Sequence, residues 1–262
     1  MMLLGKTIVV TGSASGIGAR VAEVCASLGA DVIGVDRNPG GPPLSGFIQG
    51  DISSQGGIDA IVGKLPQRID ALCNVAGLSG APGIALTVAV NFYGLRALSN
   101  GSAERMREGA AVVNVASIAG YGWRANLERG KAMVSVPGFP DVASLVAEHK
   151  VPDSHGYPLS KELLLLWTQI AAHEPQFKSR RIRVVSVSPG PVETPILKEF
   201  RQVLGDQRVD SDIAPVGRAG TPADIAPVVA FLCSDGARWI NGTNIATDGG
   251  LEAAINAQAL GF

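Results

Sequence analysis

A glycine-rich turn between an apolar strand and a helix constrains this chain more than any other feature of its sequence. The turn, Thr11-Gly12-Ser13-Ala14-Ser15-Gly16-Ile17-Gly18, directly follows the apolar run Thr7–Val10. Glycines there allow a tight turn and let the backbone approach a pyrophosphate, which the free N–H groups of the helix N-terminus can hold. The candidate cofactor-binding residues in this turn are Gly12, Ser15, Gly16, Ile17 and Gly18.

Apolar runs of strand length alternate with helical stretches along the whole chain. The expected strands are Thr7–Val10, Asp31–Val35, Gly46–Gln49, Ala71–Val75, Ala111–Val115, Ile182–Val187 and Asn244–Thr247. The expected helices include Ala19–Leu28, Ile58–Lys64, Ser160–His173 and Pro222–Leu232. Strands that are apolar on both faces and joined by helices indicate a parallel sheet with right-handed crossovers. We therefore predict an α/β fold: a single doubly wound, Rossmann-like domain over residues 1–262, with a seven-stranded parallel sheet and helices on both faces.

The composition favours a small neutral partner. The formal net charge is -1 and no basic run occurs, so nothing predicts binding of nucleic acid or of a membrane surface. The three cysteines lie far apart in apolar stretches, as buried free thiols do in a reducing compartment. The apolar start of the chain is expected to be a strand rather than a signal, and no apolar segment approaches the length of a membrane span. We expect a cytoplasmic protein.

Two other classes of site are not favoured. A triphosphate-binding loop would end in Gly-Lys-Ser/Thr, whereas Gly5-Lys6-Thr7 precedes the first strand. The three histidines have no metal-ligand spacing with one another or with the cysteines, so no metal is expected.

An acidic residue ends the second expected strand. Asp36 stands 18 residues beyond Gly18, where a carboxylate can accept hydrogen bonds from the ribose hydroxyls of a dinucleotide. The same carboxylate would repel a 2′-phosphate, which favours NAD over NADP. Arg37 next to it leaves some tolerance for NADP. A purely structural role for Asp36, at the start of a turn, remains the alternative.

Tyr157 and Lys161 are candidates for proton transfer. They stand four positions apart and so share one face of a helix. A nearby ammonium favours the phenolate and lowers the pKa of the tyrosine from its usual value of about 10. Tyr157 could then accept or donate a proton. Taken alone, the pair would equally fit a solvated helix face.

The glycine turn, Asn74-Val75-Ala76-Gly77 and the Tyr157/Lys161 pair together resemble the short-chain dehydrogenase/reductase family, from Lys6 to about Gly250. The resemblance implies that Ser117 hydrogen-bonds the substrate oxygen and Tyr157. It also implies that Asn91 supports a water near Lys161 in a proton relay. The implied catalytic residues are Asn91, Ser117, Tyr157 and Lys161.

The resemblance also implies where NAD would bind. The Asn-x-Ala-Gly stretch would pack under the adenine side, Asp51 and Ile52 would contact adenine, and the segment after the sixth strand would hold the nicotinamide carboxamide. Besides the glycine turn, Asp36 and Arg37, the implied cofactor residues are Asp51, Ile52, Asn74, Ala76, Gly77, Tyr157, Lys161, Pro189, Gly190, Val192 and Thr194.

Two spacings depart from the usual family pattern. Asn91 follows Gly77 by only 14 positions, so a truncated helix is expected there, and Ser117 and Tyr157 stand 40 positions apart. The second spacing predicts a mostly helical insertion at about 121–154. This combination resembles the bacterial 3α-hydroxysteroid dehydrogenase/carbonyl reductase and coniferyl-alcohol dehydrogenase subgroup.

The subgroup implies an oxidoreductase that moves a hydride between NAD and a hydrophobic cyclic or aryl alcohol or ketone, assembled as a homodimer or homotetramer. A non-catalytic dinucleotide sensor on the same fold remains the alternative. A nucleotide-sugar epimerase is not favoured, because only 12 residues follow Gly250. The apolar residues of the insertion could wall the substrate pocket, cover the helix that begins near Tyr157, or serve packing alone; they are Trp123, Met133, Val134, Val136 and Phe139.

Overall fold

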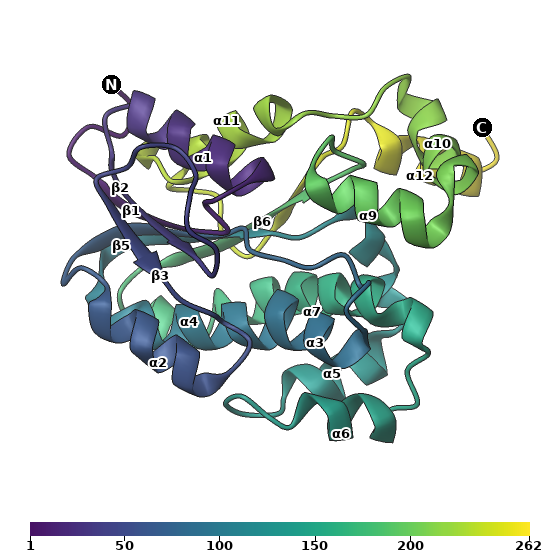
Figure 1. Cartoon of the computed structure of the whole chain (residues 1–262), viewed down its shortest axis with the longest axis horizontal. Helices are drawn as coiled ribbons and strands as arrows, with labels where there is room; N and C mark the ends of the chain where they lie inside the picture. Colours follow the sequence, from purple (N-terminus) through teal and green to yellow (C-terminus); the bar gives the residue numbers. More distant parts are fainter.

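Seven parallel strands form the centre of the computed structural model, which describes residues 1–262 (Figure 1). The strands are β1 Thr7–Thr11, β2 Asp31–Asp36, β3 Gly46–Gln49, β4 Ile69–Asn74, β5 Met106–Val115, β6 Arg183–Pro189 and β7 Asn244–Thr247. Their order in the sheet is β3-β2-β1-β4-β5-β6-β7, and every neighbouring pair is parallel. This confirms the predicted doubly wound sheet. The winding reverses between β1 and β4, where folds of this kind open a crevice for ligands.

Helices cover both faces of the sheet. On one face lie α1 Gly16–Ser27 and α11 Pro222–Leu232, and on the other lie α2 Gln55–Lys64, α4 Leu95–Ser102 and α7 Gly156–Ala171 (Figure 1). Two apolar cores follow from this arrangement, one on each face. All three cysteines are free and buried in the structure, and the Sγ atoms of Cys73 and Cys233 lie 3.4 Å apart.

The shorter elements gather around the edges. They are α8 Pro175–Lys178, α9 Pro195–Leu204, α10 Asp206–Ile213 and α12 Leu251–Ala259, with short helical turns at Ala103–Arg105, Ala214–Val216 and Asp235–Ala237. None of the helices combines the length and apolar character that a membrane crossing needs.

The helix that carries Tyr157 begins earlier than expected. Helix α7 starts at Gly156 rather than at Ser160, so Pro158 falls in its first turn. Proline is tolerated there because the first N–H groups of a helix have no intrahelical partner. Tyr157 therefore lies in the first turn of α7, with Lys161 one turn later.

The segment between β4 and β5 corrects the expectation of a truncated helix. Three stretches run on without a break: α3 Ile84–Val88, a π-helical stretch η1 Ala89–Gly94, and α4. What is short is the loop 75–83 before them. Gly83, with φ of 99°, turns the chain into α3.

The segment 121–154 is mostly helical, as expected. It contains the end of η3 Ile118–Arg124, then α5 Leu127–Val134, α6 Val142–Glu148 and η4 Asp153–His155. Helix α5 packs on α7 and α6 on α3, below the sheet in Figure 1. The five apolar side chains singled out in the sequence pack against this helical layer. The geometry therefore favours a cover over α3 and α7, and only Trp123 also borders a small cavity near Ser117.

Side chains of η1 and α4 hold this segment through hydrogen bonds to its main-chain carbonyls. Tyr93 Oη donates a hydrogen bond of 2.8 Å to the carbonyl of Met133. Arg96, which is only 6% exposed, donates to the carbonyls of Val134, Val136 and Gly138 at 2.8, 2.7 and 2.6 Å. Its guanidinium also lies 4.9 Å from the centre of the Tyr93 ring. A buried cation thus binds the carbonyls at the end of α5, where the helix dipole is negative.

Candidate active site

The glycine turn has no room for side chains. Gly12 has φ of +70°, and a Cβ atom there would lie 2.9 Å from the backbone of Ala76. A Cβ atom on Gly18 would lie 2.0 Å from the carbonyl oxygen of Gly12. The turns after β1 and β4 therefore meet backbone to backbone, and α1 packs directly on the first turn. The glycines are thus required for packing of the two turns and of α1, and the binding of a pyrophosphate at this turn stays a prediction.

Thr11 couples these two turns, a role that was not predicted from the sequence. Its Oγ1 accepts hydrogen bonds from the N–H groups of Val75 and Ala76 at 3.0 and 3.1 Å. The side chain is 1% exposed, so these bonds are shielded from water. The only signal in the sequence was a hydroxyl residue directly before the first glycine.

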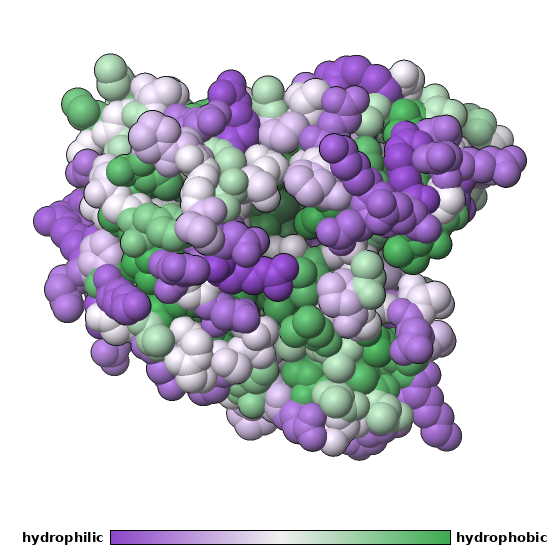
Figure 2. Space-filling view, in the orientation of Figure 1, coloured by the Kyte–Doolittle hydropathy of each residue, from purple (hydrophilic) through white to green (hydrophobic).

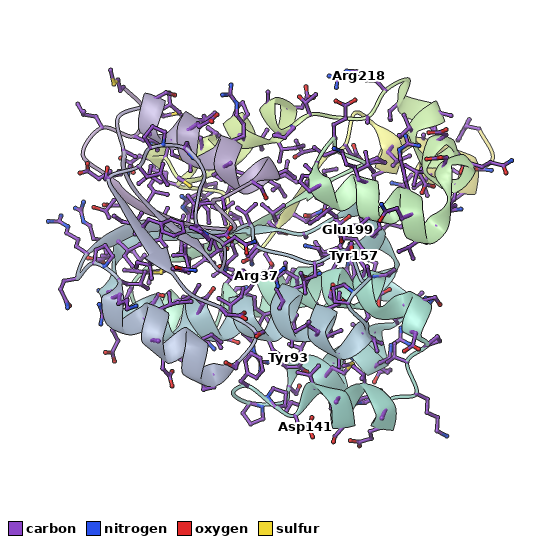
Figure 3. The ribbon with its side chains drawn as sticks, in the orientation of Figure 1. Arg37, Tyr93, Asp141, Tyr157, Glu199 and Arg218 are labelled. Atoms are coloured by element: carbon purple, nitrogen blue, oxygen red, sulfur yellow. The ribbon has the colours of Figure 1, made fainter.

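The Asp36 carboxylate is fixed at the end of β2. It accepts from the N–H of Ala14 at 3.0 Å and from that of Asn38 at 2.9 Å. Both the structural and the ligand-binding interpretation fit this arrangement, since the carboxylate is half-buried beside the glycine turn. Arg37 is exposed next to it (Figure 3).

Asn74 lies beneath the loop after β4. Its Nδ2 donates to Ser99 Oγ and to Asn114 Oδ1, both at 2.8 Å, and the residue is fully buried. Asn114 in turn donates to Thr168 Oγ1 on α7 at 2.9 Å. The Asn74 side chain therefore ties β4 to α4 and β5, and its contact with a cofactor stays a prediction.

The other residues expected on the adenine side differ in exposure. Asp51 is exposed, and its Oδ1 accepts from the N–H of Ser53 at 2.8 Å. Ile52 is 6% exposed, and its carbonyl lies directly against Gly94. Ala76 and Gly77 are half-buried, next to Gly12 and Asn91 respectively.

Ser117, Tyr157 and Lys161 come together beyond the carboxyl end of β5. The Ser117 hydroxyl lies near enough to the Tyr157 phenol to lower its pKa, and Lys161 Nζ lies 5.6 Å from the centre of the Tyr157 ring. Ser117 sits at the start of η3, and its Oγ also accepts from the N–H of Ala119 at 3.2 Å. The three groups expected to carry the chemistry thus share one site.

The electrostatics of this site differ from the expectation. Burial raises the pKa of Tyr157 above its usual value, and the nearby Ser117 hydroxyl, which lowers it, only partly offsets this. Burial also lowers the pKa of Lys161 from 10.5 to about 8. Lys161 Nζ donates to the carbonyl of Val115 at 2.9 Å and lies beside the ring rather than at the hydroxyl. The expected lowering of the tyrosine pKa by the lysine is therefore not seen in this arrangement.

Asn91 lies in the π-helical stretch and is fully buried. Its Oδ1 accepts from the N–H of Leu78 at 2.7 Å, and its Nδ2 donates to Leu78 O and Ser160 Oγ at 2.9 and 3.1 Å. Both Asn91 Oδ1 and Lys161 Nζ lie within 4 Å of where a Cβ atom on Gly77 would be. The side chain of Asn91 thus positions the loop beside the lysine.

The segment after β6 closes the other side of the site. Pro189 ends the strand, Val192 pairs with Gly220, and Thr194 caps α9 with its Oγ1 hydrogen-bonded to Leu197 N at 3.4 Å. The Thr194 side chain lies 3.4 Å from the Cβ position of Gly16. The glycine turn, predicted to hold the pyrophosphate, and Thr194, predicted to hold the nicotinamide carboxamide, are therefore neighbours. Gly190 packs against Asp248.

Helix α9 extends over Tyr157, with α3 and α7 on the opposite side (Figures 1 and 3). The Phe200 ring meets the Tyr157 ring edge-on at 4.8 Å, and Ser79 Oγ donates to Glu199 Oε2. Figure 2 shows the surface hollowed between these two parts. We call this space the reactive cleft. Neither Ser79, Glu199 nor Phe200 was singled out in the sequence, because nothing in the chain order indicates that they meet.

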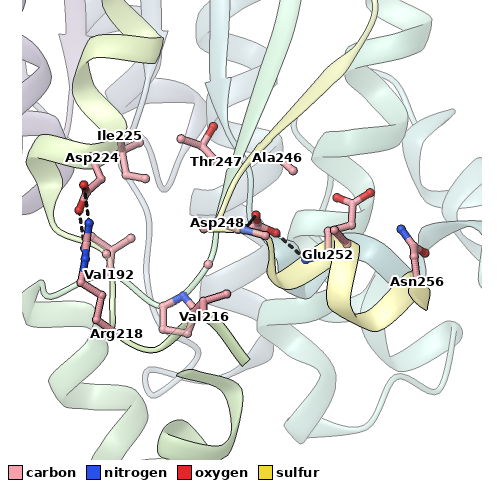
Figure 4. Close-up of a pocket in the computed structure, with 16 residues that line it drawn as sticks. Val192, Val216, Arg218, Asp224, Ile225, Ala246, Thr247, Asp248, Glu252 and Asn256 are labelled. Carbon is pink, nitrogen blue, oxygen red and sulfur yellow. Dashed lines mark hydrogen bonds and ion pairs between the residues drawn. The ribbon is translucent and has the colours of Figure 1, made fainter. Parts of the chain in front are cut away.

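Two cavities adjoin this region. The larger, about 610 Å³, lies between Val192, Val216, Ile225 and the start of α12, and is apart from Tyr157 (Figure 4). Arg218 forms two 2.9 Å hydrogen bonds with Asp224 at its rim. The smaller, about 160 Å³, borders Ser117 and Trp123.

Comparison with known proteins assigns the family. Residues 6–127 match the model described as short chain dehydrogenase, and residues 140–252 match the model described as enoyl-(acyl carrier protein) reductase. A coniferyl-alcohol dehydrogenase from Pseudomonas sp. strain HR199 is 42% identical over 96% of this chain and 98% of its own length. The chain belongs to the short-chain dehydrogenase/reductase family, as the sequence motifs predicted. It is an oxidoreductase, for which a nicotinamide dinucleotide is the expected cofactor.

Two hydroxysteroid dehydrogenases are also similar. A 3-alpha-hydroxysteroid dehydrogenase/carbonyl reductase from Comamonas testosteroni is 27% identical over 95% of this chain and 97% of its own. The crystal structure of the 3-alpha-hydroxysteroid dehydrogenase from Pseudomonas sp. B-0831, complexed with NADH, has a TM-score of 0.83 and 32% identity, covering 97% of this chain and 99% of that one. The predicted subgroup resemblance is thus confirmed.

Proposed function

We propose that this protein is an NAD-dependent dehydrogenase that interconverts a hydrophobic cyclic or aryl alcohol with its aldehyde or ketone. The observation that carries the proposal is the meeting of Ser117, Tyr157 and Lys161 beyond the carboxyl end of β5. These three residues face the segment after β6 across the end of the sheet. A purely binding protein would not need a half-buried phenol and a buried amine at one site.

The residues of the site have distinct proposed roles. In alcohol oxidation, Ser117 hydrogen-bonds the substrate oxygen, and the Tyr157 phenolate takes the hydroxyl proton. Lys161, through its ammonium, and Asn91, through the loop it holds, position the groups around the tyrosine. When bound, the oxidised nicotinamide supplies the hydride acceptor and a positive charge near the phenol. In the reverse direction the protonated Tyr157, which burial favours, donates the proton.

The choice of NAD over NADP rests on Asp36. Its carboxylate is fixed by two backbone N–H groups and would lie against a 2′-phosphate, which it repels. The relative solved with NADH supports the same choice. The proposed contacts of the cofactor are the glycine turn, Asp36, Arg37, Asp51, Ile52, Asn74, Ala76, Gly77, Tyr157, Lys161, Pro189, Gly190, Val192 and Thr194.

The apolar substrate class is supported by two observations. Phe200 and Tyr157 present aromatic surface inside the reactive cleft. The relatives act on coniferyl alcohol and on 3-alpha-hydroxysteroids, as their names state.

We also propose a cytoplasmic homodimer or homotetramer. Trp239 is 97% exposed, and β7 is an edge strand whose side chains are half-covered at most. Burying an aromatic side chain of that size is a common feature of subunit contacts.

The decisive experiment is turnover of coniferyl alcohol and of 3α-hydroxysteroids with NAD and with NADP, followed by nicotinamide absorbance. Tyr157→Phe should lower kcat by about 10²–10⁴-fold, because it removes the group that transfers the proton. NADH binding should stay within about twofold, which shows that the variant is folded. NADH binding without turnover of any alcohol by the wild type would favour the sensor instead.

A further inference from the structure

Two consecutive side chains of α9 contact the two walls of the reactive cleft. Glu199 accepts a hydrogen bond from Ser79 in the loop after β4, and Phe200 lies edge-on to Tyr157. Ser79 is only 5% exposed, so its contact with Glu199 is inside the cleft. Figure 3 shows Glu199 directly beside Tyr157, between α9 and α7.

The loop that holds Glu199 also touches Tyr157. A Cβ atom on Gly80, the residue after Ser79, would lie 3.5 Å from Tyr157 Cβ. Glu199 is therefore near Tyr157 along both routes, through Phe200 on its own helix and through Ser79 and Gly80 across the cleft. The Glu199 carboxylate therefore lies in the same cleft as Tyr157.

The charge of Glu199 is not neutralised by a basic partner. Its hydrogen-bond partner is a neutral hydroxyl, and it forms no ion pair. Lys161 is directed to the carbonyl of Val115, and Lys198 is exposed on α9. In a partly buried cleft an uncompensated carboxylate acts strongly on a nearby charge.

Helix α9 is also joined to α10 by ion pairs. Arg201, on the same helix as Glu199, pairs with Asp206 at 3.0 Å and with Asp210 at 2.9 Å, both in α10. Both aspartates are mostly exposed, so these pairs add little, and the position of the Glu199 carboxylate depends on its hydrogen bond with Ser79.

We propose that Glu199 is a specificity-determining residue that admits uncharged alcohols and rejects those with a carboxylate near the reacting carbon. The inference rests on the proposed function, since it concerns the substrate of the same site. Ser79 holds the carboxylate in place, and the repulsion between two carboxylates makes the selection. Two carboxylates about 6 Å apart, at an effective dielectric constant between that of water and that of a dry protein interior, repel each other enough to lower the kcat/KM of a charged alcohol about tenfold.

Two variants separate the charge from the hydrogen bond. Glu199→Gln removes the charge but keeps an oxygen that can accept from Ser79. Ser79→Ala removes the hydrogen bond but keeps the charge. Glu193→Gln is the matched control, because Glu193 is an exposed glutamate on the same segment, and its charge acts on Arg218 rather than in the cleft.

The test compares 4-(hydroxymethyl)benzoate with its methyl ester, which differ in charge but hardly in shape, as substrates with saturating NAD. For Glu199→Gln the ratio of kcat/KM, acid over ester, should rise about tenfold. Ser79→Ala should change that ratio by less than about threefold, and Glu193→Gln should leave it unchanged.

The possible outcomes are distinct. An unchanged ratio in Glu199→Gln, with wild-type turnover of the ester, overturns the inference and leaves the proposed function intact. An equal rise in Glu193→Gln also overturns it, because the effect would then be the net charge of the segment. If the wild type oxidises neither the methyl ester nor any other alcohol tested, the proposed function is overturned, and the inference with it.

Discussion

The cofactor side and the substrate side of the reactive cleft reach close contact by different means. At the glycine turn backbone meets backbone, and a Cβ atom on Gly18 would lie 2.0 Å from the carbonyl oxygen of Gly12. Over Tyr157 side chain meets side chain, through Phe200 and through Ser79 with Glu199. The first arrangement tolerates one residue type at each position, whereas the second can be rebuilt with other side chains. A constant cofactor and a variable substrate call for that division.

The largest effect is expected where backbone packing is broken. Gly18→Ala forces α1 away from the first turn, and overpacking of this kind typically costs about 1–3 kcal/mol. If the displaced turn carries this strain, NADH affinity should fall by up to about a hundredfold. Titration of NADH fluorescence measures it. Gly63→Ala, in open space on α2, is the matched control and should bind NADH normally. Equal binding by both variants would show that the close packing at Gly18 is not needed.

On the substrate side a smaller effect is expected, and there the substitution stabilises the fold instead of straining it. Lys161→Met should raise the free energy of unfolding at pH 7 by about 2 kcal/mol while abolishing turnover. Burial lowers the pKa of Lys161 from 10.5 to about 8, so keeping its ammonium inside the fold destabilises the wild type. The substitution removes this penalty, but it also removes the hydrogen bond to Val115, which offsets about 1 kcal/mol of the gain.

The pH dependence of this gain follows from proton binding. Between pH 8 and 10.5 the unfolded wild type binds more protons at Lys161 than the folded protein does, so its stability from this group rises with pH. The advantage of Lys161→Met should therefore be largest below pH 8 and nearly gone at pH 10. Denaturant unfolding of both proteins at pH 7 and 10 checks this, and a gain that does not change with pH would contradict it.

The smallest effect is expected at the edge of the cofactor side. Asp36→Ala should weaken NAD binding about tenfold and relax discrimination against NADP, since it removes a charge-assisted hydrogen bond at a half-exposed site. Dissociation constants for both dinucleotides test this. A variant that still prefers NAD as strongly as the wild type would show that Asp36 serves only the turn that it caps.

The sequence predicted the sheet and the family, and it placed the ends of the strands within two residues except at β5, which begins at Met106 rather than Ala111. These predictions rest on local patterns, which can be recognised in the sequence: the glycine-rich turn, the apolar runs and the spacing of Tyr157 and Lys161. The start of α7 was wrong by four residues because Gly156 and Pro158 resemble a turn when read alone. The burial of Asn74 was missed because it depends on Asn114, 40 positions away.

The substrate side was predicted less well for the same reason. Ser79 and Glu199 stand 120 positions apart, and no repeat, motif or charge pattern links them. The raised pKa of Tyr157 was also missed, because burial outweighs the lysine and burial is a property of the fold.

The buried guanidinium of Arg96 has a consequence for exchange of parts between relatives. The three carbonyls that it binds all belong to the segment 121–154, so a chimera that loses this segment loses all three acceptors and uncovers the apolar layer beneath it. Conversely, a host with an apolar residue at this position leaves the three carbonyls of the segment without their donor. Helix α4 and the segment 121–154 therefore depend on each other. Transfer of this segment into another member of the family should also transfer an arginine at the position of Arg96 in α4.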